Sequence, residues 1–144
     1  MLFRYTAACV LLAAAFPALA QADTDAQSPP TVDLELNTIT DTDSACRLSF
    51  VAHNRTTSAI DKVVFETVIF DGAGGVATLS LFDFRDLPQG RPRVRQFDVP
   101  GIPCASIARV LINGANTCTA AGAESDICDS ALSTRSRIDV ELLG

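Results

Sequence analysis

The chain has 144 residues, of which 48% are hydrophobic, and a formal net charge of −6. An acidic balance argues against a surface for nucleic acid or anionic lipid, because phosphate contacts need clustered Lys and Arg. The length suits a single domain that buries its core without help from a cofactor.

Residues 1–20 have the pattern of a signal peptide. Arg4 supplies the positive start, an apolar run extends from Ala7 to Phe16, and Ala18-Leu19-Ala20 matches the small-x-small pattern that signal peptidase reads. The apolar run is too short to cross a bilayer, and no later stretch is long enough. We therefore predict a periplasmic or secreted protein with no stable membrane insertion after signal cleavage.

The predicted mature chain begins at Gln21. It keeps 10 basic residues against 17 acidic ones, so its formal charge is −7. Residues 21–31 are polar and contain two prolines, which is typical of a flexible leader. Residues 32–144 form the predicted domain.

The stretch Ile60–Asp71 (IDKVVFETVIFD), followed by the turn Gly72–Gly75, organises that domain. Val, Ile, Phe and Thr suit a pleated, buried surface. Both alternating sets of positions are largely apolar, which favours a central strand covered on both sides. We place it in the middle of a small β-sandwich.

Six further runs alternate in the manner of strands and are separated by turn residues. They are Val32–Asn37, Cys46–His53, Val76–Phe84, Arg93–Val99, Ser106–Asn113 and Arg137–Leu143. Between Thr119 and Ser133 the chain has helical character. We predict an all-β fold: an immunoglobulin-like antiparallel β-sandwich of about seven strands, with a short helical or irregular crossover before the last one.

Two finer expectations concern the surface of this sandwich. The first strand and Val76–Phe84 are the expected sheet edges, where unpaired backbone groups accept an added strand. In the fifth strand, Phe97 and Val99 are expected to point inward and Arg93 and Arg95 outward. The basic cluster Arg91–Arg95 is thus interpreted as an exposed strand face.

Four cysteines remain once Cys9 leaves with the signal peptide, and an even number in an exported domain predicts two disulfides. Three pairings are possible. The fifth strand should run antiparallel beside the second, which brings Cys46 and Cys104 to the same end of the sandwich. We predict Cys46–Cys104, worth about 4 kcal/mol for a loop of roughly 60 residues, and Cys118–Cys128, worth less.

The sequence offers no catalytic constellation. His53 is the single histidine, and no G-x-S-x-G elbow exposes a nucleophilic serine beside it. The cysteines do not form a C-x-x-C motif or a zinc-ligand set, and the acidic loop Thr40–Ser44 lacks EF-hand spacing. We expect no catalytic residue, no metal, no cofactor and no enzymatic activity.

The run from Cys46 through Asn113 resembles a group of uncharacterised exported proteobacterial proteins that are often labelled by their secretion signal. Its core VVFETVIFDGAGGV also resembles the FxLYD-type immunoglobulin-like modules of bacterial envelope proteins, which share an apolar strand, an aromatic-Asp pair and a glycine turn. The resemblance implies a sandwich module in the envelope and no catalytic residues.

These observations predict a protein-binding or accessory module of the cell envelope, with a protein partner. The alternative is a small-ligand binding protein with an apolar pocket between the sheets near Phe65, Phe82, Phe84 and Phe97, although ordinary core packing is the favoured interpretation of these rings. A hydrolase using His53 ranks third.

Overall fold

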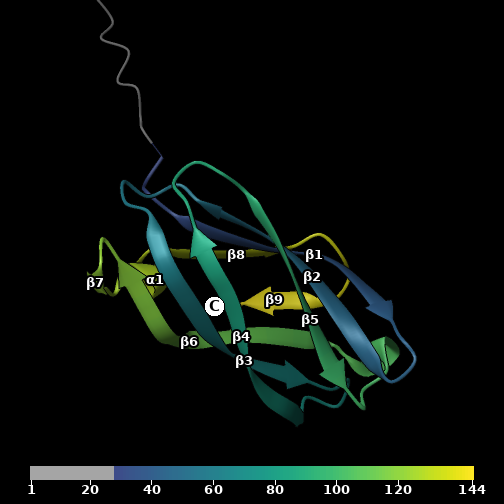
Figure 1. The fold of residues 1–144 in the computed structure, drawn as a ribbon. Coiled ribbons are helices and arrows are strands. Elements are labelled where there is room, and N and C mark those ends of the chain that lie inside the picture. Colours follow the sequence, from purple (N-terminus) through teal and green to yellow (C-terminus); the bar gives the residue numbers. More distant parts are fainter. Residues whose placement is uncertain (1–27) are drawn as a thin grey trace, which may run out of the picture.

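The computed structural model describes residues 28–144, which fold into two stacked β-sheets (Figure 1). Sheet A has the strand order β5-β2-β1-β8, and sheet B has the order β4-β3-β6-β7 with β9 paired to β6. The strands are β1 (Val32–Asp41), β2 (Ala45–Asn54), β3 (Ile60–Phe70), β4 (Val76–Leu87), β5 (Arg93–Pro100), β6 (Arg109–Ala120), β7 (Ala123–Glu124), β8 (Leu132–Ser136) and β9 (Glu141–Leu143). Two short helices, η1 (Cys104–Ser106) and α1 (Ile127–Ser130), complete the elements.

The order in which the chain visits the two sheets is that of an immunoglobulin-like Greek key. It builds the β1–β2 hairpin in sheet A and the β3–β4 hairpin in sheet B, returns β5 to the side of β2, and then places β6 beside β3. The predicted fold class is therefore confirmed. Two pairs, β1–β8 and β6–β9, are parallel, so the sandwich is antiparallel only in its main part.

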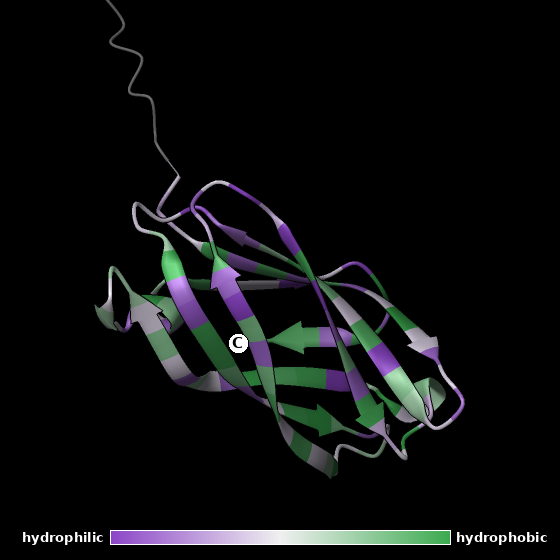
Figure 2. Cartoon of the chain, in the orientation of Figure 1, coloured by the Kyte–Doolittle hydropathy of each residue, from purple (hydrophilic) through white to green (hydrophobic). Residues whose placement is uncertain are grey.

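Aromatic side chains fill the space between the sheets. Phe50 meets Phe84 edge-on with centroids 5.5 Å apart, Phe65 meets Phe84 in the same way, and Phe82 stacks on Phe97 at 4.3 Å. These rings belong to one continuous core cluster, with Phe97 packed on its margin. The favoured interpretation of these phenylalanines as core is confirmed, and their mutual packing occupies the place of the alternative ligand pocket. The green and purple bands along the strands in Figure 2 show the alternation that aims one set of residues at this core.

Strand β3 is central, as predicted. Val63, Phe65, Thr67 and Ile69 are fully buried on its inner side, while Val64 and Val68 on its outer side are only 9% and 7% exposed. The turn that follows is also as expected: the Asp71 carboxylate accepts hydrogen bonds from the Ala73 and Gly75 amides, and Gly74 has a φ of 84°. No third layer covers the outer side of β3 among residues 28–144, so neighbouring side chains of β4 and β6 shield it.

The prediction for the end of the chain is corrected. Residues 137–140 are bends, and the last strand is only Glu141–Leu143. The sequence pattern missed β8, which begins at the end of the expected crossover, because LSTRS holds one large apolar residue and gives no clear alternation. The helical expectation for the crossover is met by α1.

The prediction for the sheet edges is half correct. β4 is the edge of sheet B, but β1 lies inside sheet A between β2 and β8. Arg93 and Arg95 also differ from expectation, since they share a face with Phe97 and Val99, as residues two apart in a strand must.

The predicted signal peptide and residues 21–27 of the predicted leader lie outside the described residues and stay predictions. Residues 28–30 are exposed and have no regular structure. Within residues 28–144, no helix has the length and apolar character needed to cross a membrane.

Candidate interaction surfaces

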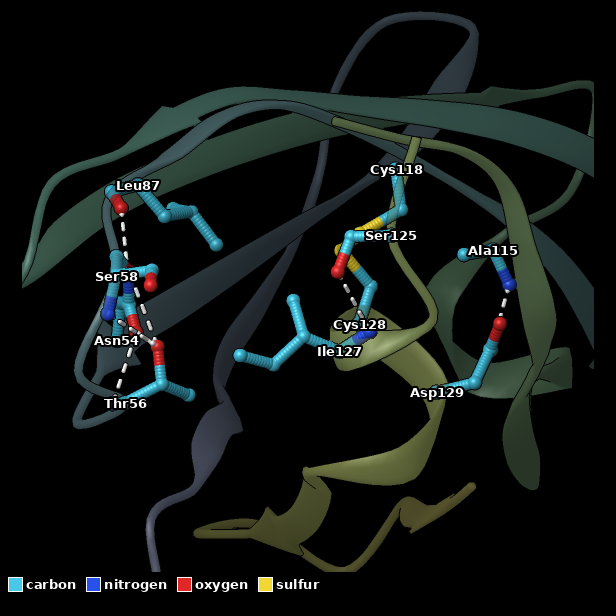
Figure 3. Close-up of a disulfide and its surroundings, with 10 residues drawn as sticks. All are labelled: Asn54, Thr56, Ser58, Leu87, Ala115, Cys118, Ser125, Ile127, Cys128 and Asp129. Carbon is cyan, nitrogen blue, oxygen red and sulfur yellow. Dashed lines mark hydrogen bonds between the residues drawn. A yellow bond between two sulfur atoms is a disulfide. The ribbon is translucent and has the colours of Figure 1, made fainter. Parts of the chain in front are cut away.

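Both predicted disulfides are present. Cys46–Cys104 joins the start of β2 to η1 with Cα atoms 4.9 Å apart, and Cys118–Cys128 joins β6 to α1 with Cα atoms 6.1 Å apart (Figure 3). One bridge thus anchors the loop after sheet A's edge strand, and the other anchors the crossover to sheet B. Their role is structural, because both bridges are part of the core cluster.

Asn54 closes one end of the sandwich (Figure 3). Its side chain is fully buried, its Nδ2 donates to the carbonyls of Ser58 and Leu87, and its Oδ1 accepts from the amide and hydroxyl of Thr56. These bonds tie the end of β2 in sheet A to the end of β4 in sheet B. The sequence Asn54-Arg55-Thr56 matches a glycosylation sequon, but in the folded protein this amide is already occupied and enclosed.

The outer face of sheet A is mostly polar, and several of its charged side chains form ion pairs. Arg47 pairs with Asp98, Arg55 with Asp33 and Arg135 with Glu35, each with an N–O distance of 2.7 Å. Gln96 adds a hydrogen bond to Ser49. These pairs run between adjacent strands, so the face satisfies its own charges and suits contact with water.

Two carboxylates on this face titrate at lower pH than usual. The pKa of Glu35 is lowered by a hydrogen bond from Asn37 and then by its hydrogen bond and attraction to Arg135. The pKa of Asp98 is lowered by the hydrogen bond from Arg47. Both carboxylates therefore stay ionised as part of the ion-pair lattice near neutral pH.

The outer face of sheet B carries a continuous row of aliphatic side chains. Strand register places Leu79 of β4 beside Val68 of β3, Val68 beside Leu111 of β6, and Leu111 beside Leu143 of β9. We call these four residues the aliphatic row. Val76 and Leu81, on either side of Leu79 along β4, extend it, with exposed fractions of 64% and 54%.

The distribution of exposed aliphatic side chains separates the two faces. Within residues 28–144, five large hydrophobic side chains are exposed: Val76, Leu79, Leu81 and Leu143 on sheet B, and Val94 on sheet A. Single exposed aliphatic residues are ordinary on a protein surface, whereas a contiguous group marks an interaction site.

One ion pair and one hydrogen bond lie at the border of the aliphatic row. Arg109 pairs with Glu141 at 2.7 Å and lies over the ring of Phe70 at 6.0 Å. On the other side, Asn113 donates a hydrogen bond to Glu66. The Arg109–Glu141 pair is neutral overall, whereas Glu66 keeps its negative charge.

The edge strands β4 of sheet B and β5 of sheet A lie on the same side of the sandwich. Two arginines of β5 contact β4 at one end of these strands. The Arg95 guanidinium donates to the carbonyl oxygens of Phe84 and Asp86 at 2.6 and 3.0 Å, and Arg93 approaches the Asp86 carboxylate. The basic cluster is thus corrected from an exposed strand face to a link between the two sheets. It satisfies unpaired carbonyls of β4 between residues 84 and 86, where Arg85 adopts a φ of 59°.

Beyond this link the two edges enclose a hollow of about 530 Å³, lined by Leu81, Asp83, Arg85, Val94, Arg95, Gln96 and Phe97. A second hollow of about 470 Å³ lies beside the Cys118–Cys128 bridge, and Asp129 at its wall accepts a hydrogen bond from the Ala115 amide. Within residues 28–144, no three His, Cys, Asp or Glu side chains are grouped to hold a metal ion.

His53 lies half-exposed near the end of β2, directly opposite Asp33 on β1. Alternation puts both side chains on the outer face of sheet A. His53 is thus a partly exposed histidine near a strand end.

No family model matches the chain, and no curated protein matches it. The solved structure of IrmA from Escherichia coli is similar in fold, with a TM-score of 0.61 and 11% sequence identity over 74% of this chain and 92% of IrmA. At that identity the likeness concerns the fold alone. The chain is thus a disulfide-bonded β-sandwich, and its surfaces carry the argument about function.

Proposed function

We propose that the protein is a protein-binding or accessory module of the cell envelope that docks through the outer face of sheet B. The aliphatic row and its neighbours Val76 and Leu81 carry this proposal, because they concentrate exposed apolar area on one face while the opposite face pairs its own charges. Interfaces have apolar centres depleted in charge and polar rims. Sheet B has this arrangement, with Arg109–Glu141 at its border.

The expected partner is a protein with an apolar, uncharged patch of its own. The aliphatic row itself carries no charge, and Arg109 and Glu141 at its border already pair with each other, so a strongly charged partner gains little from this face. Predicted export to the periplasm or the medium supports an envelope role. The two disulfides are of the kind that oxidising compartments maintain, and residues 1–20 have the pattern of a signal peptide.

The proposal includes no catalytic role. His53 faces outward from sheet A beside Asp33, and we assign no serine to act with it as a nucleophile. If the protein turned over a hydrolase substrate and lost that turnover on His53→Ala, an enzymatic function would replace the proposal.

Site-specific photo-crosslinking in cells that produce the protein tests the docking face. A photoreactive phenylalanine at Leu81 probes sheet B, and the same photoreactive group at Val94 is a matched control, since both side chains are apolar, exposed and on edge strands. We expect a discrete crosslinked protein at Leu81 that is absent at Val94 and is reduced when Leu143→Asp is added. Equal products at both positions would contradict the proposal.

A further inference from the structure

Residues Ala77–Phe82 form an unguarded edge in sheet B. Natural proteins protect edge strands with charges, prolines, short length or a covering element, because free N–H and C=O groups invite another strand. The other edges of this sandwich are protected: β5 carries Arg93, Arg95 and Asp98, β8 carries Arg135, and β7 and β9 have only two and three residues. Ala77–Phe82 has neither a charge nor a proline, and Arg95 reaches only the carbonyls of residues 84 and 86.

An added strand must match two different sides of this edge. Leu79 and Leu81 point to the outer face and are 52% and 54% exposed, while Thr78 and Ser80 point to the inner side and are half-buried. A fitting strand therefore alternates aliphatic residues with small hydroxyl residues and carries no charge. The hollow between β4 and β5, lined in part by Leu81 and Phe97, gives room to the inward side chains of such a strand.

The segment itself meets these requirements. We propose that β4 pairs with β4 of a second copy of this chain, antiparallel and centred on Leu79, so that the two B sheets join into one continuous sheet. In this register Leu79 lies opposite Leu79 of the second copy and Thr78 opposite Ser80, and the regular pairing ends at Ala77, where the β3–β4 ladder shifts its register. Leucine thus faces leucine on the outer side, and hydroxyls face hydroxyls on the inner side.

Charge also permits this pairing despite the acidic chain. The first charged residue beyond the segment is Asp83, which lies past the paired stretch, toward the uncharged Gly72–Gly75 turn of the second copy. No like charges face each other across the joint. A two-fold axis makes the interface self-complementary, and the aliphatic rows of both copies become neighbours on one side of the joined sheet.

A cysteine trap tests the pairing and its register in the full mature chain. Leu79→Cys places two thiols directly opposite each other, where paired Cα atoms lie about 4.5–5.5 Å apart, within reach of a disulfide. Leu81→Cys is the matched control, because the two thiols would then be offset by about 14 Å along the strands. Under mild oxidation we expect peptide maps of Leu79→Cys to contain an intermolecular disulfide between the two introduced thiols, and at least about tenfold less dimer from Leu81→Cys.

Sedimentation equilibrium supplies a readout without new thiols. Leu79→Lys puts two positive charges face to face, so we expect it to lower the association constant at least about tenfold relative to the unmodified chain. Ser133→Lys, at an exposed position of edge strand β8 on the far side of sheet A, should leave that constant unchanged. Equal trapping at positions 79 and 81, or a purely monomeric unmodified chain at millimolar concentration together with no disulfide-linked dimer of Leu79→Cys, would overturn the pairing. Failure of the photo-crosslink at Leu81 to find another protein would bear on the docking proposal and leave this result untouched.

Discussion

A row of four paired residues crosses the outer face of each sheet, and the two rows are unlike. In sheet A the row is Val94, Val51, Glu35 and Arg135, and it ends in an ion pair. In sheet B it is Leu79, Val68, Leu111 and Leu143, aliphatic throughout. Both rows lie on the same frame and point away from the same core. We propose that the difference reflects what each face contacts, with water at sheet A and another protein surface at sheet B.

The largest expected effects come from the disulfides that anchor each sheet's loops. Replacing Cys46 and Cys104 with Ala should lower the free energy of unfolding by about 4 kcal/mol, because the bridge spans a sequence separation of 58. Replacing Cys118 and Cys128, separated by 10, should cost about 3 kcal/mol. Urea denaturation of both double variants measures the two losses of unfolding free energy. A larger loss for the Cys118–Cys128 pair would show that the entropy of the unfolded chain does not govern how much each disulfide stabilises the fold.

Asn54 joins the two sheets, and Asn54→Ala should cost about 2–3 kcal/mol. The variant leaves the buried Leu87 carbonyl and the Thr56 amide without their partner. Asn113→Ala is the control, since Asn113 is exposed on sheet B and should change stability by less than about 0.5 kcal/mol. Thermal unfolding followed by circular dichroism compares the stability of the two variants. Equal losses of stability would show that Asn54 does not link the two sheets.

Changing the aliphatic face should alter surface properties with little effect on stability. Leu79→Thr with Leu81→Thr should stay within about 0.5 kcal/mol of the unmodified chain, because both side chains are already half-exposed and Thr suits a strand. Binding of a hydrophobic dye should fall, whereas Val94→Thr on sheet A should leave it unchanged. Unchanged dye binding by the sheet B variant would show that this face is not an apolar surface in solution.

The smallest expected effect is on the pH dependence of stability in acid. Because the pKa of Glu35 is lowered in the folded state, its contribution to stability is present above the ordinary carboxyl pKa and is lost as the pH falls through the folded value. Between about pH 6 and about pH 3, Glu35→Gln should therefore lose less stability than the unmodified chain. Glu124→Gln, at an exposed site on β7, controls for the removal of one charge. Identical slopes for Glu35→Gln and the unmodified chain would contradict the hydrogen-bond origin of the shift.

Local patterns were enough to predict much of this fold. The apolar run of β3 and the Asp71 glycine turn identify the central hairpin, and the antiparallel placement of β5 beside β2 predicts the Cys46–Cys104 bridge. These features depend on alternation and turn chemistry, which are encoded within short stretches.

The remaining features depend on tertiary context. β8 is a polar pentapeptide that becomes a strand because β1 offers it a partner, so β1 could not be identified as an interior strand. In β4 both alternating sets contain apolar residues, Leu79 and Leu81 in one and Phe82 and Phe84 in the other. Only packing against Phe50 and Phe65 decides which set faces the core. The aliphatic row could therefore not be predicted from the sequence.

The central claim is that sheet B is covered in the protein's working environment and sheet A is not. Hydroxyl-radical footprinting compares the protein inside the cells that produce it with the purified protein at low concentration. We predict that Leu79, Leu81 and Leu143 are oxidised several-fold less in cells, while His53 and Val94 on sheet A react equally in both samples. Equal oxidation of the sheet B leucines in the two samples would contradict the account.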